Sequence, residues 1–279
     1  CIRDSDHLEP ALEACYELTK RFTAEFAIRP LLERHPAALD RLDQWADDPN
    51  EHVRRLVSEG TRPRLPWARR LHLPRDRVLR LLARLRADAS PYVRRSVANH
   101  LNDLLKEEDD DEILSLLERW YAEGGEGTRW IVRHALRNRL KSGDPRVLRL
   151  FGYAEPRVEI VQLSVTPERV AMGEAVHIAV ELQNEIDEEQ RLMIDLVVGY
   201  RKANGSTSPK VVKFRDFTLR PAGRANFEKN LAMVERSTRT LHPGAHSIAL
   251  RINGVDSSSV AFELTPTSPN EAVNLRHRQ

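Results

Sequence analysis

The first half of the chain repeats itself with a period of 40 residues. DDPNEHVRRLVSEG at 47–60 aligns with ADASPYVRRSVANH at 87–100, and both contain the string Val-Arg-Arg near the centre. WIVRHALRNRL at 130–140 is a third copy at a spacing of 39, and DPRVLRL at 144–150 begins a fourth. A period near 40 with two helices per unit is typical of HEAT-like repeats, because each helix pair needs its neighbours to bury its apolar face. The repeat predicts an α-solenoid over residues 1–154.

From residue 155 onward the pattern changes to alternation of apolar and polar residues. The seven alternating runs are RVEIVQLSV, AVHIAVEL, RLMIDLVVGY, KVVKFRDFTL, ANFEKNLAMV, HSIALRI and SVAFEL. Turn sequences such as ANGSTSP, RPAG and HPGA separate them, as an antiparallel sandwich requires. We therefore expect a multidomain α and β protein, with an Ig-like β-sandwich at 155–265. The stretch 266–279 has the composition of a disordered tail.

Composition excludes several classes of protein and site. The 279 residues are 41% hydrophobic and 31% charged, and no apolar run reaches the length of a membrane span. Two cysteines, Cys1 and Cys15, give neither a disulfide framework nor a zinc pattern, and the histidines show no paired metal spacing. We expect a soluble, cytoplasmic monomer that needs no cofactor or metal and has no membrane partner.

The net charge of +2 hides a very uneven distribution of charge. Residues 54–95 contain thirteen arginines and only three acids, whereas acids gather in KEEDDDE at 106–112. A solvated surface without a charged partner usually interleaves its signs. The segregation therefore favours a polyanionic partner, and a nucleic acid above all.

The repeat also predicts which side chains share a face. If Val53 and its neighbours form the core stripe of each second helix, Arg55 and Glu59 lie on the opposite side. Side-by-side helices would then present a column of basic residues beside a column of acid and amide. The first column is Arg55, Arg95 and His134, and the second is Glu59, Asn99 and Asn138. A polar solvent face of a solenoid without any ligand remains the alternative at this point.

Three motifs followed by an Ig-like domain resemble the AlkC branch of the DNA alkylation repair glycosylases. They are EFAIRPLL at 25–32, SEGTRPRLPWARRL at 58–71 and RRSVANHLND at 94–103. The resemblance implies an enzyme that excises cationic alkylated bases, chiefly 3-methyladenine, from double-stranded DNA without base flipping, leaving an abasic site. It implies that Glu25, Glu59 and Asp103 are catalytic, and that Trp67 and Trp130 contact the lesion. The residues expected to bind DNA are Arg54, Arg55, Arg62, Arg64, Arg94, Arg95, Arg133, His134 and Lys141.

Chemistry explains why such an enzyme needs acids inside a cationic groove. An alkylated adenine already carries positive charge and is a good leaving group, so little general-acid help is required. Positive charge develops on the deoxyribose, where a nearby carboxylate stabilises it and can orient or deprotonate the attacking water. A Trp67 ring would offer its face to the cationic nucleotide, and arginines would hold phosphates.

Each candidate also has a structural alternative. Glu59 could simply pair with Arg55 one turn away, Glu25 could cap its helix, and Asp103 could be a solvated acid. Trp67 could fill the gap where two prolines break the helix. Trp45 and Trp120 lie in first-helix patterns and are expected in the core. The competing function is a non-catalytic HEAT-repeat and Ig-like scaffold that binds DNA or protein.

Overall fold

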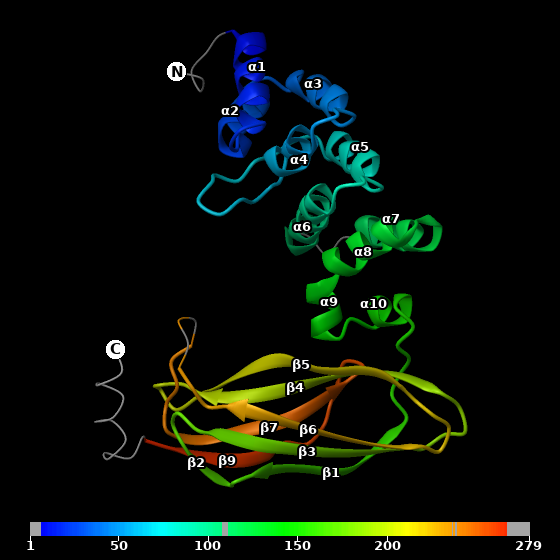
Figure 1. Cartoon of the computed structure of the whole chain (residues 1–279), viewed down its shortest axis with the longest axis vertical. Helices are drawn as coiled ribbons and strands as arrows, with labels where there is room; N and C mark the ends of the chain where they lie inside the picture. Colours follow the sequence, from blue (N-terminus) through cyan, green and yellow to red (C-terminus); the bar gives the residue numbers. More distant parts are fainter. Residues whose placement is uncertain (1–6, 108–110, 236, 238, 267–279) are drawn as a thin grey trace. The chain divides into compact units, whose positions relative to one another are not determined.

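The computed structural model describes residues 7–107, 111–235, 237 and 239–266. The chain divides into two compact units, residues 1–138 and 139–279. The first unit is helical, and the second contains two short helices followed by β-strands (Figure 1). A helical region followed by a β-sheet domain is therefore confirmed.

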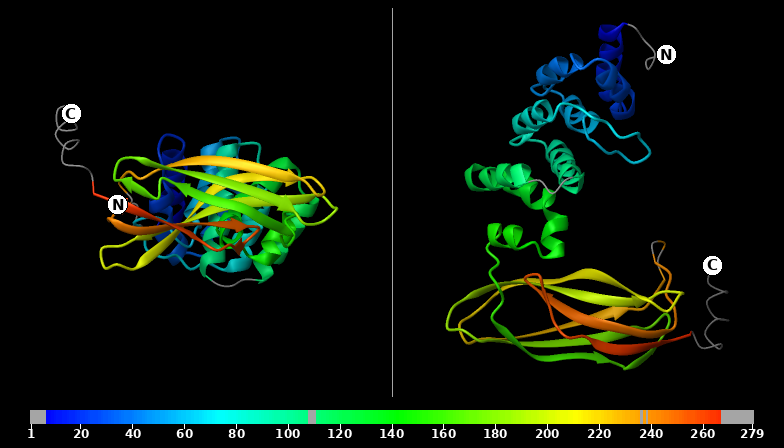
Figure 2. Two further views of the ribbon diagram at one scale, coloured as in Figure 1. Left: turned by 90° about the horizontal axis from the view of Figure 1, so that it is seen from below. Right: turned by 180° about the vertical axis from the view of Figure 1, so that it is seen from behind.

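The helical unit consists of short helices joined by turns, with one long loop. Its helices are α1 (Leu8–Thr19), α2 (Glu25–Arg34), α3 (Ala38–Trp45), α4 (Glu51–Gly60), α5 (Arg75–Leu85), α6 (Pro91–Glu107), α7 (Asp111–Glu123) and α8 (Glu126–Ala135). Helix α6 packs between α4 and α8, and α3, α5 and α7 each pack on the helix that follows them (Figures 1 and 2). The second helices of the three aligned copies thus lie side by side, as the repeat predicts.

The repeated residues explain this packing. Val53 and Val93, at the same place in two copies, are both completely buried between helices. The arginine that follows each valine binds the segment before its own helix, and Arg54 also binds the next copy of the repeat. Arg54 binds the carboxylate of Asp88 (Nε to Oδ2, 2.6 Å) and also donates to two backbone carbonyls before α4, and Arg94 donates to two carbonyls before α6. Trp45 and Trp120 are buried, which confirms their place in the core.

The second unit is built on two sheets that share one apolar core. The strands are β1 (Val158–Thr166), β2 (Arg169–Ala171), β3 (Ala175–Asn184), β4 (Gln190–Arg201), β5 (Thr207–Leu219), β6 (Arg224–Ala232), β7 (Gly244–Ile252), β8 (Val255–Asp256) and β9 (Val260–Thr265). One sheet has the order β1-β3-β6, and the other has the order β2-β9-β7-β4-β5, with β8 paired to β7. Alternate residues of β3 are buried, from Val176 to Leu182, and meet inward residues of β4 and β7.

All seven predicted strands are present, but the sequence missed two short ones. β2 is three residues long and pairs with β9 in parallel, so the domain is not purely antiparallel. It arises because the chain crosses from β1 in one sheet to the edge of the other. Such a short segment contains too few alternating residues to be recognised from sequence.

Two short helices, α9 (Arg137–Ser142) and α10 (Pro145–Leu150), connect the repeats to the strands. Most of this segment belongs to the second unit, because its backbone packs on the β8 turn. A Cβ added to Gly143 would come within 2.7 Å of the Gly254 Cα. The Arg251 guanidinium donates to the Lys141 carbonyl, and the Tyr153 hydroxyl donates to Asp216. The two compact units therefore divide at 138/139, earlier than the predicted domain boundary at 154/155. Of the predicted tail at 266–279, residues 267–279 lie outside the described residues.

Candidate active site in the helical unit

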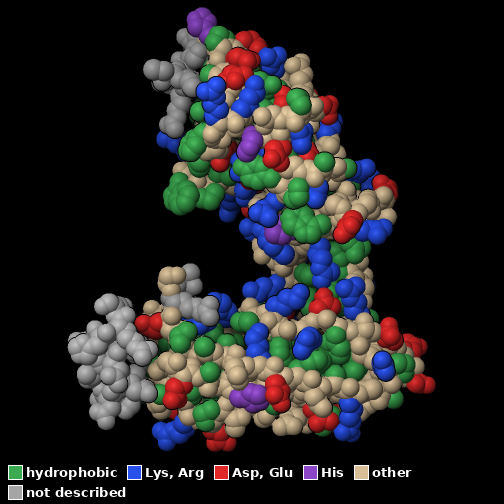
Figure 3. Space-filling view, viewed as in Figure 1, with side chains coloured by type: hydrophobic (Ala, Val, Ile, Leu, Met, Phe, Trp, Pro, Cys, Tyr) green, Lys and Arg blue, Asp and Glu red, His purple; other side chains and the backbone are tan. Residues whose placement is uncertain are grey.

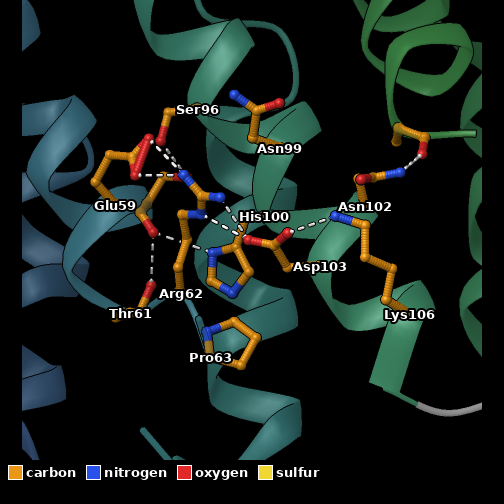
Figure 4. Close-up of polar contacts among 12 residues, drawn as sticks. Glu59, Thr61, Arg62, Pro63, Ser96, Asn99, His100, Asn102, Asp103 and Lys106 are labelled. Carbon is orange, nitrogen blue, oxygen red and sulfur yellow. Dashed lines mark hydrogen bonds and ion pairs between the residues drawn. The ribbon is translucent and has the colours of Figure 1, made fainter. Parts of the chain in front are cut away.

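Two of the three predicted acids meet on a single arginine (Figure 4). The Arg62 guanidinium lies between Glu59 and Asp103, with Nη1 2.9 Å from Oε2 of Glu59 and Nε 2.9 Å from Oδ2 of Asp103. Lys106 reaches the other oxygen of Asp103 at 3.3 Å. Burial lowers the pKa of Arg62, but the charges and hydrogen bonds of Glu59 and Asp103 outweigh this and raise it above its usual value. Arg62 was predicted to bind DNA, whereas here its donors face two carboxylates.

The third acid joins the same cluster through a second arginine. Arg55 lies 3.7 Å from a Glu25 oxygen and 3.6 Å from a Glu59 oxygen, so it bridges α2 and the end of α4. Its guanidinium also lies over the Tyr92 ring, 4.7 Å from the centroid. One Glu25 oxygen is buried and accepts no hydrogen bond. Glu25, Glu59 and Asp103, from three different helices, thus form one cluster with two shared arginines.

Close packing holds the end of α4 in this position. A Cβ on Gly60 would come within 2.7 Å of the Ile28 side chain, so the glycine allows α4 to approach α2 next to Glu59. On the other side, the Ser58 carbonyl contacts Nδ1 of His100 at 3.0 Å, and the Ser58 and Ser96 hydroxyls are 2.8 Å apart. Burial, together with the nearby Arg62 charge, lowers the pKa of His100 to about 3, so its ring is neutral.

Trp67 stands on the long loop between α4 and α5, which begins at Thr61 and ends at Pro74. Its side chain is 98% exposed, so it does not fill a gap in the core. Its φ of +62° is the left-handed conformation that bulky residues rarely adopt, and such strain is often found at functional positions. A hollow of about 430 Å³ lies beside it, lined also by Phe26, Arg29 and Arg69.

The loop is fastened by an arginine that sequence reasoning missed. Arg29 is only 5% exposed, and its guanidinium donates to the carbonyls of Arg62 (2.5 Å), Arg69 (2.7 Å) and Pro63 (3.4 Å). Burial is the main cause that lowers its pKa, and the Arg62 charge adds to it. The residue lies inside the EFAIRPLL motif, which was its only signal in the sequence.

The structural alternatives for the acids fit less well. Asp103 is buried rather than solvated, and no side chain caps α2, which Glu25 begins. Glu59 does pair with Arg55, but it pairs more closely with Arg62. The acids are therefore more than isolated surface charges.

The remaining predicted DNA-binding residues divide into groups. Arg64 and Arg95 are exposed, whereas Arg54 and Arg94 donate to the backbone before their own helices, and Arg54 also binds Asp88 of the next copy. Arg133 is half-buried, and Lys141 belongs to the second unit, so nothing places it beside the cluster.

Trp130 and His134 form a second exposed feature of the helical unit. Their rings stack 4.9 Å apart, and Trp130 is 42% exposed. Burial, then the charges of Arg137 and Arg95, lower the pKa of His134. This favours a neutral ring at pH 7, so His134 supports the stack and is a poor phosphate-binding cation.

Basic side chains gather over α6 and α8 of the helical unit, and apolar side chains stand out at the end of the α4–α5 loop (Figure 3). Within the described residues, no three His, Cys, Asp or Glu side chains are arranged to hold a metal ion. Among those same residues no helix combines the length and apolar character needed to cross a membrane.

Comparison with known proteins agrees with this organisation. Residues 19–138 match the family model described as DNA alkylation repair enzyme, and residues 159–266 match that of the C-terminal Ig-like domain of YhaZ. The chain is 34% identical to the uncharacterized protein YhaZ of Bacillus subtilis (strain 168) over 92% of this chain and 72% of that protein. The structure of Pseudomonas fluorescens alkylpurine DNA glycosylase AlkC, bound to DNA containing an abasic site analog, matches with a TM-score of 0.88 and 37% identity, covering 95% of this chain and 75% of that one. The chain therefore belongs to the DNA alkylation repair enzyme family and ends in an Ig-like domain.

Proposed function

We propose that the protein is a monofunctional DNA glycosylase of base excision repair. It hydrolyses the N-glycosidic bond of cationic alkylated bases, chiefly 3-methyladenine, in double-stranded DNA and leaves an abasic site. The observation that carries the proposal is the cluster of three carboxylates from three helices beside the exposed Trp67 loop, in a chain 37% identical to an alkylpurine DNA glycosylase.

The charge of the cluster suits this reaction. Glu25, Glu59 and Asp103 each pair with an arginine, and these arginine partners fix the three acids in place before DNA binds. Charge that is already oriented stabilises the positive charge developing on the deoxyribose without reorganisation during the reaction. One of the acids also orients or deprotonates the attacking water. We assign the first role to Glu59, because it touches both arginines.

The arrangement also favours attack without base flipping. The Trp67 ring is exposed on the helical unit, which we describe as a HEAT-like solenoid, and the 430 Å³ hollow beside it opens to solvent, while Arg62 of the same loop holds the buried Glu59 and Asp103. Such a surface can approach a stacked nucleotide from outside the helix. Exposed arginines such as Arg64 and Arg95 would hold phosphates. The Ig-like sandwich would complete the grip on DNA, and the enzyme would act as a monomer in the cytoplasm, on the nucleoid.

The direct test is release of free bases. The full chain is incubated with DNA treated with a methylating agent, and the soluble fraction is separated by chromatography. We expect 3-methyladenine in that fraction, together with abasic sites in the DNA. Binding to DNA with no base released would support the non-catalytic scaffold instead.

A further inference from the structure

The α4–α5 loop needs an anchor, because the residue at its tip buries almost nothing. Trp67 is 98% exposed and has a positive φ, so neither burial nor an ordinary backbone conformation fixes its place. Within the loop, the Leu71 amide donates to the Pro63 carbonyl and the Ala68 amide donates to the Leu65 carbonyl. These bonds close the loop on itself but do not attach it to a helix.

Arg29 supplies the attachment to α2. The carbonyls that it binds lie on both limbs of the loop, at Arg62 and Pro63 before Trp67 and at Arg69 after it. A planar guanidinium can reach several acceptors in one fixed geometry, and a lysine ammonium in its place would be a single point charge. The position therefore requires arginine rather than any cation.

The same anchor acts on the acid cluster. Arg62, whose carbonyl accepts the shortest bond from Arg29, is also the residue whose side chain joins Glu59 to Asp103. A shift of the Arg62 backbone would therefore move the guanidinium that orients both acids. Misplacement by about 1 Å can lower a rate on the order of 10²-fold.

We propose that Arg29 is a positioning residue that fastens the 61–74 loop to α2. It thereby keeps Trp67 and Arg62 in fixed positions relative to the acids. Arg29 itself touches no reacting atom. This inference rests on the proposed function for its effect on rate, although the anchoring can be tested without DNA.

The first test is limited proteolysis of the full chain. Arg64, Arg69 and Arg70 are exposed in the loop and none is followed by proline, so trypsin can cut there once the loop opens. We expect Arg29→Lys to be cut in the loop roughly tenfold faster than wild type, because charged hydrogen bonds to the loop are lost. Arg29→Gln, uncharged but still a donor, should behave similarly. Arg54→Lys is the matched control, since Arg54 also binds backbone carbonyls but outside the loop, and its loop cleavage should stay at the wild-type rate.

The second test is a double-mutant cycle on single-turnover excision of 3-methyladenine. We expect Arg29→Lys to lower the rate on the order of 10- to 10²-fold in wild type, and by much less in a Trp67→Ala background, because both changes affect the same loop. DNA affinity and the tryptophan-detected unfolding midpoint are measured alongside. Unchanged loop cleavage, or equal rate losses in both backgrounds, would overturn the inference. If wild type releases no base, the proposed function fails, and the cleavage result alone decides whether Arg29 anchors the loop.

Discussion

The helical unit and the β-sheet unit each bury a carboxylate, and the two are surrounded differently. Glu59 lies between the guanidinium groups of Arg55 and Arg62, at 3.6 and 2.9 Å. Asp195, on β4, is equally buried, and burial raises its pKa although Lys213, Lys141 and Arg251 oppose this. A buried charge is retained at a cost unless its partners are close. The helical unit provides Glu59 with close partners, as a functional acid requires. The cations around Asp195 do not offset the cost of burying its carboxylate.

Each unit also contains a close contact at a glycine, and the two contacts have different consequences. In the helical unit the close approach of α4 to α2 at Gly60 places Glu59 near Glu25. In the β-sheet unit the backbones of Gly143 and Gly254 lie close together, and this contact fastens α9 and α10 to the strands. The Gly60 contact brings two candidate acids together, whereas the Gly143 contact attaches the connecting helices to the β-sheet unit. All four tryptophans lie before residue 138, so tryptophan fluorescence follows the helical unit alone.

Substitution of Gly254 should lower the stability of the β-sheet unit. Gly254→Ala adds a Cβ within 2.8 Å of the Gly143 Cα at a φ of +86°, so we expect a loss of about 2–3 kcal/mol in the free energy of unfolding. Gly205→Ala is the control, since its φ is +81° but its surroundings are open. Circular dichroism of the strands should show the larger loss for Gly254, with the tryptophan signal unchanged. Equal losses would mean that packing against α9 contributes nothing.

Charge reversal in the helical unit should affect DNA binding instead of stability. Arg95 is exposed on α6, and Arg95→Glu should weaken duplex binding by roughly tenfold and reduce its salt dependence, because a phosphate contact is lost. Arg80→Glu, an equal change at an exposed site on α5, should weaken binding less. Fluorescence anisotropy over a range of salt concentrations measures both. The same loss at Arg80 would show that only net charge matters.

His100 makes the stability of the helical unit depend on pH. Its folded pKa of about 3 lies below the ordinary value of 6.5, so between these values the unfolded state binds more protons. Stability from this group is complete above pH 6.5 and falls as the pH drops, by up to about 1.4 kcal/mol per pH unit. His100→Asn keeps a donor for the Ser58 carbonyl and should remove this slope. Urea titrations followed by tryptophan fluorescence would refute the account if both proteins showed the same slope.

Asp195 should give the smallest effect. Because burial raises its pKa, its ionised form destabilises the folded β-sheet unit at neutral pH, and stability falls as the pH rises through the folded pKa. Asp195→Asn should therefore raise the melting temperature slightly at pH 7 and leave it almost unchanged at pH 4. A lower melting temperature at pH 7 would show that the carboxylate has favourable partners.

Sequence patterns predicted the helices and strands well, but predicted poorly how the segment that connects the two units packs. Alternation identified seven strands, and the 40-residue period placed Val53 and Val93 in the core, because periodicity records which face is buried. It could not assign α9 and α10 to the β-sheet unit. That assignment depends on contacts such as Tyr153 with Asp216, which are far apart in the chain.

The arginines show the same limit. Clustered charge and motif matching suggested that Arg54, Arg62 and Arg94 bind DNA, but each is occupied by protein acceptors. Arg29 was overlooked because one arginine among apolar residues has no distinctive pattern. Only three-dimensional contacts distinguish an arginine that is free to meet phosphate from one that holds a loop or a carboxylate.

The central claim is that the negative charge of Glu59 accelerates excision. Glu59→Gln keeps the shape of the side chain and its hydrogen-bonding reach but removes the charge between Arg55 and Arg62. Single-turnover release of 3-methyladenine from a defined duplex should slow on the order of 10²- to 10³-fold. Duplex affinity should stay equal or rise, because an acid has been removed from a polyanion-binding surface. Release at the wild-type rate, with the variant folded and bound to DNA, would contradict the claim and make Glu25 the leading candidate.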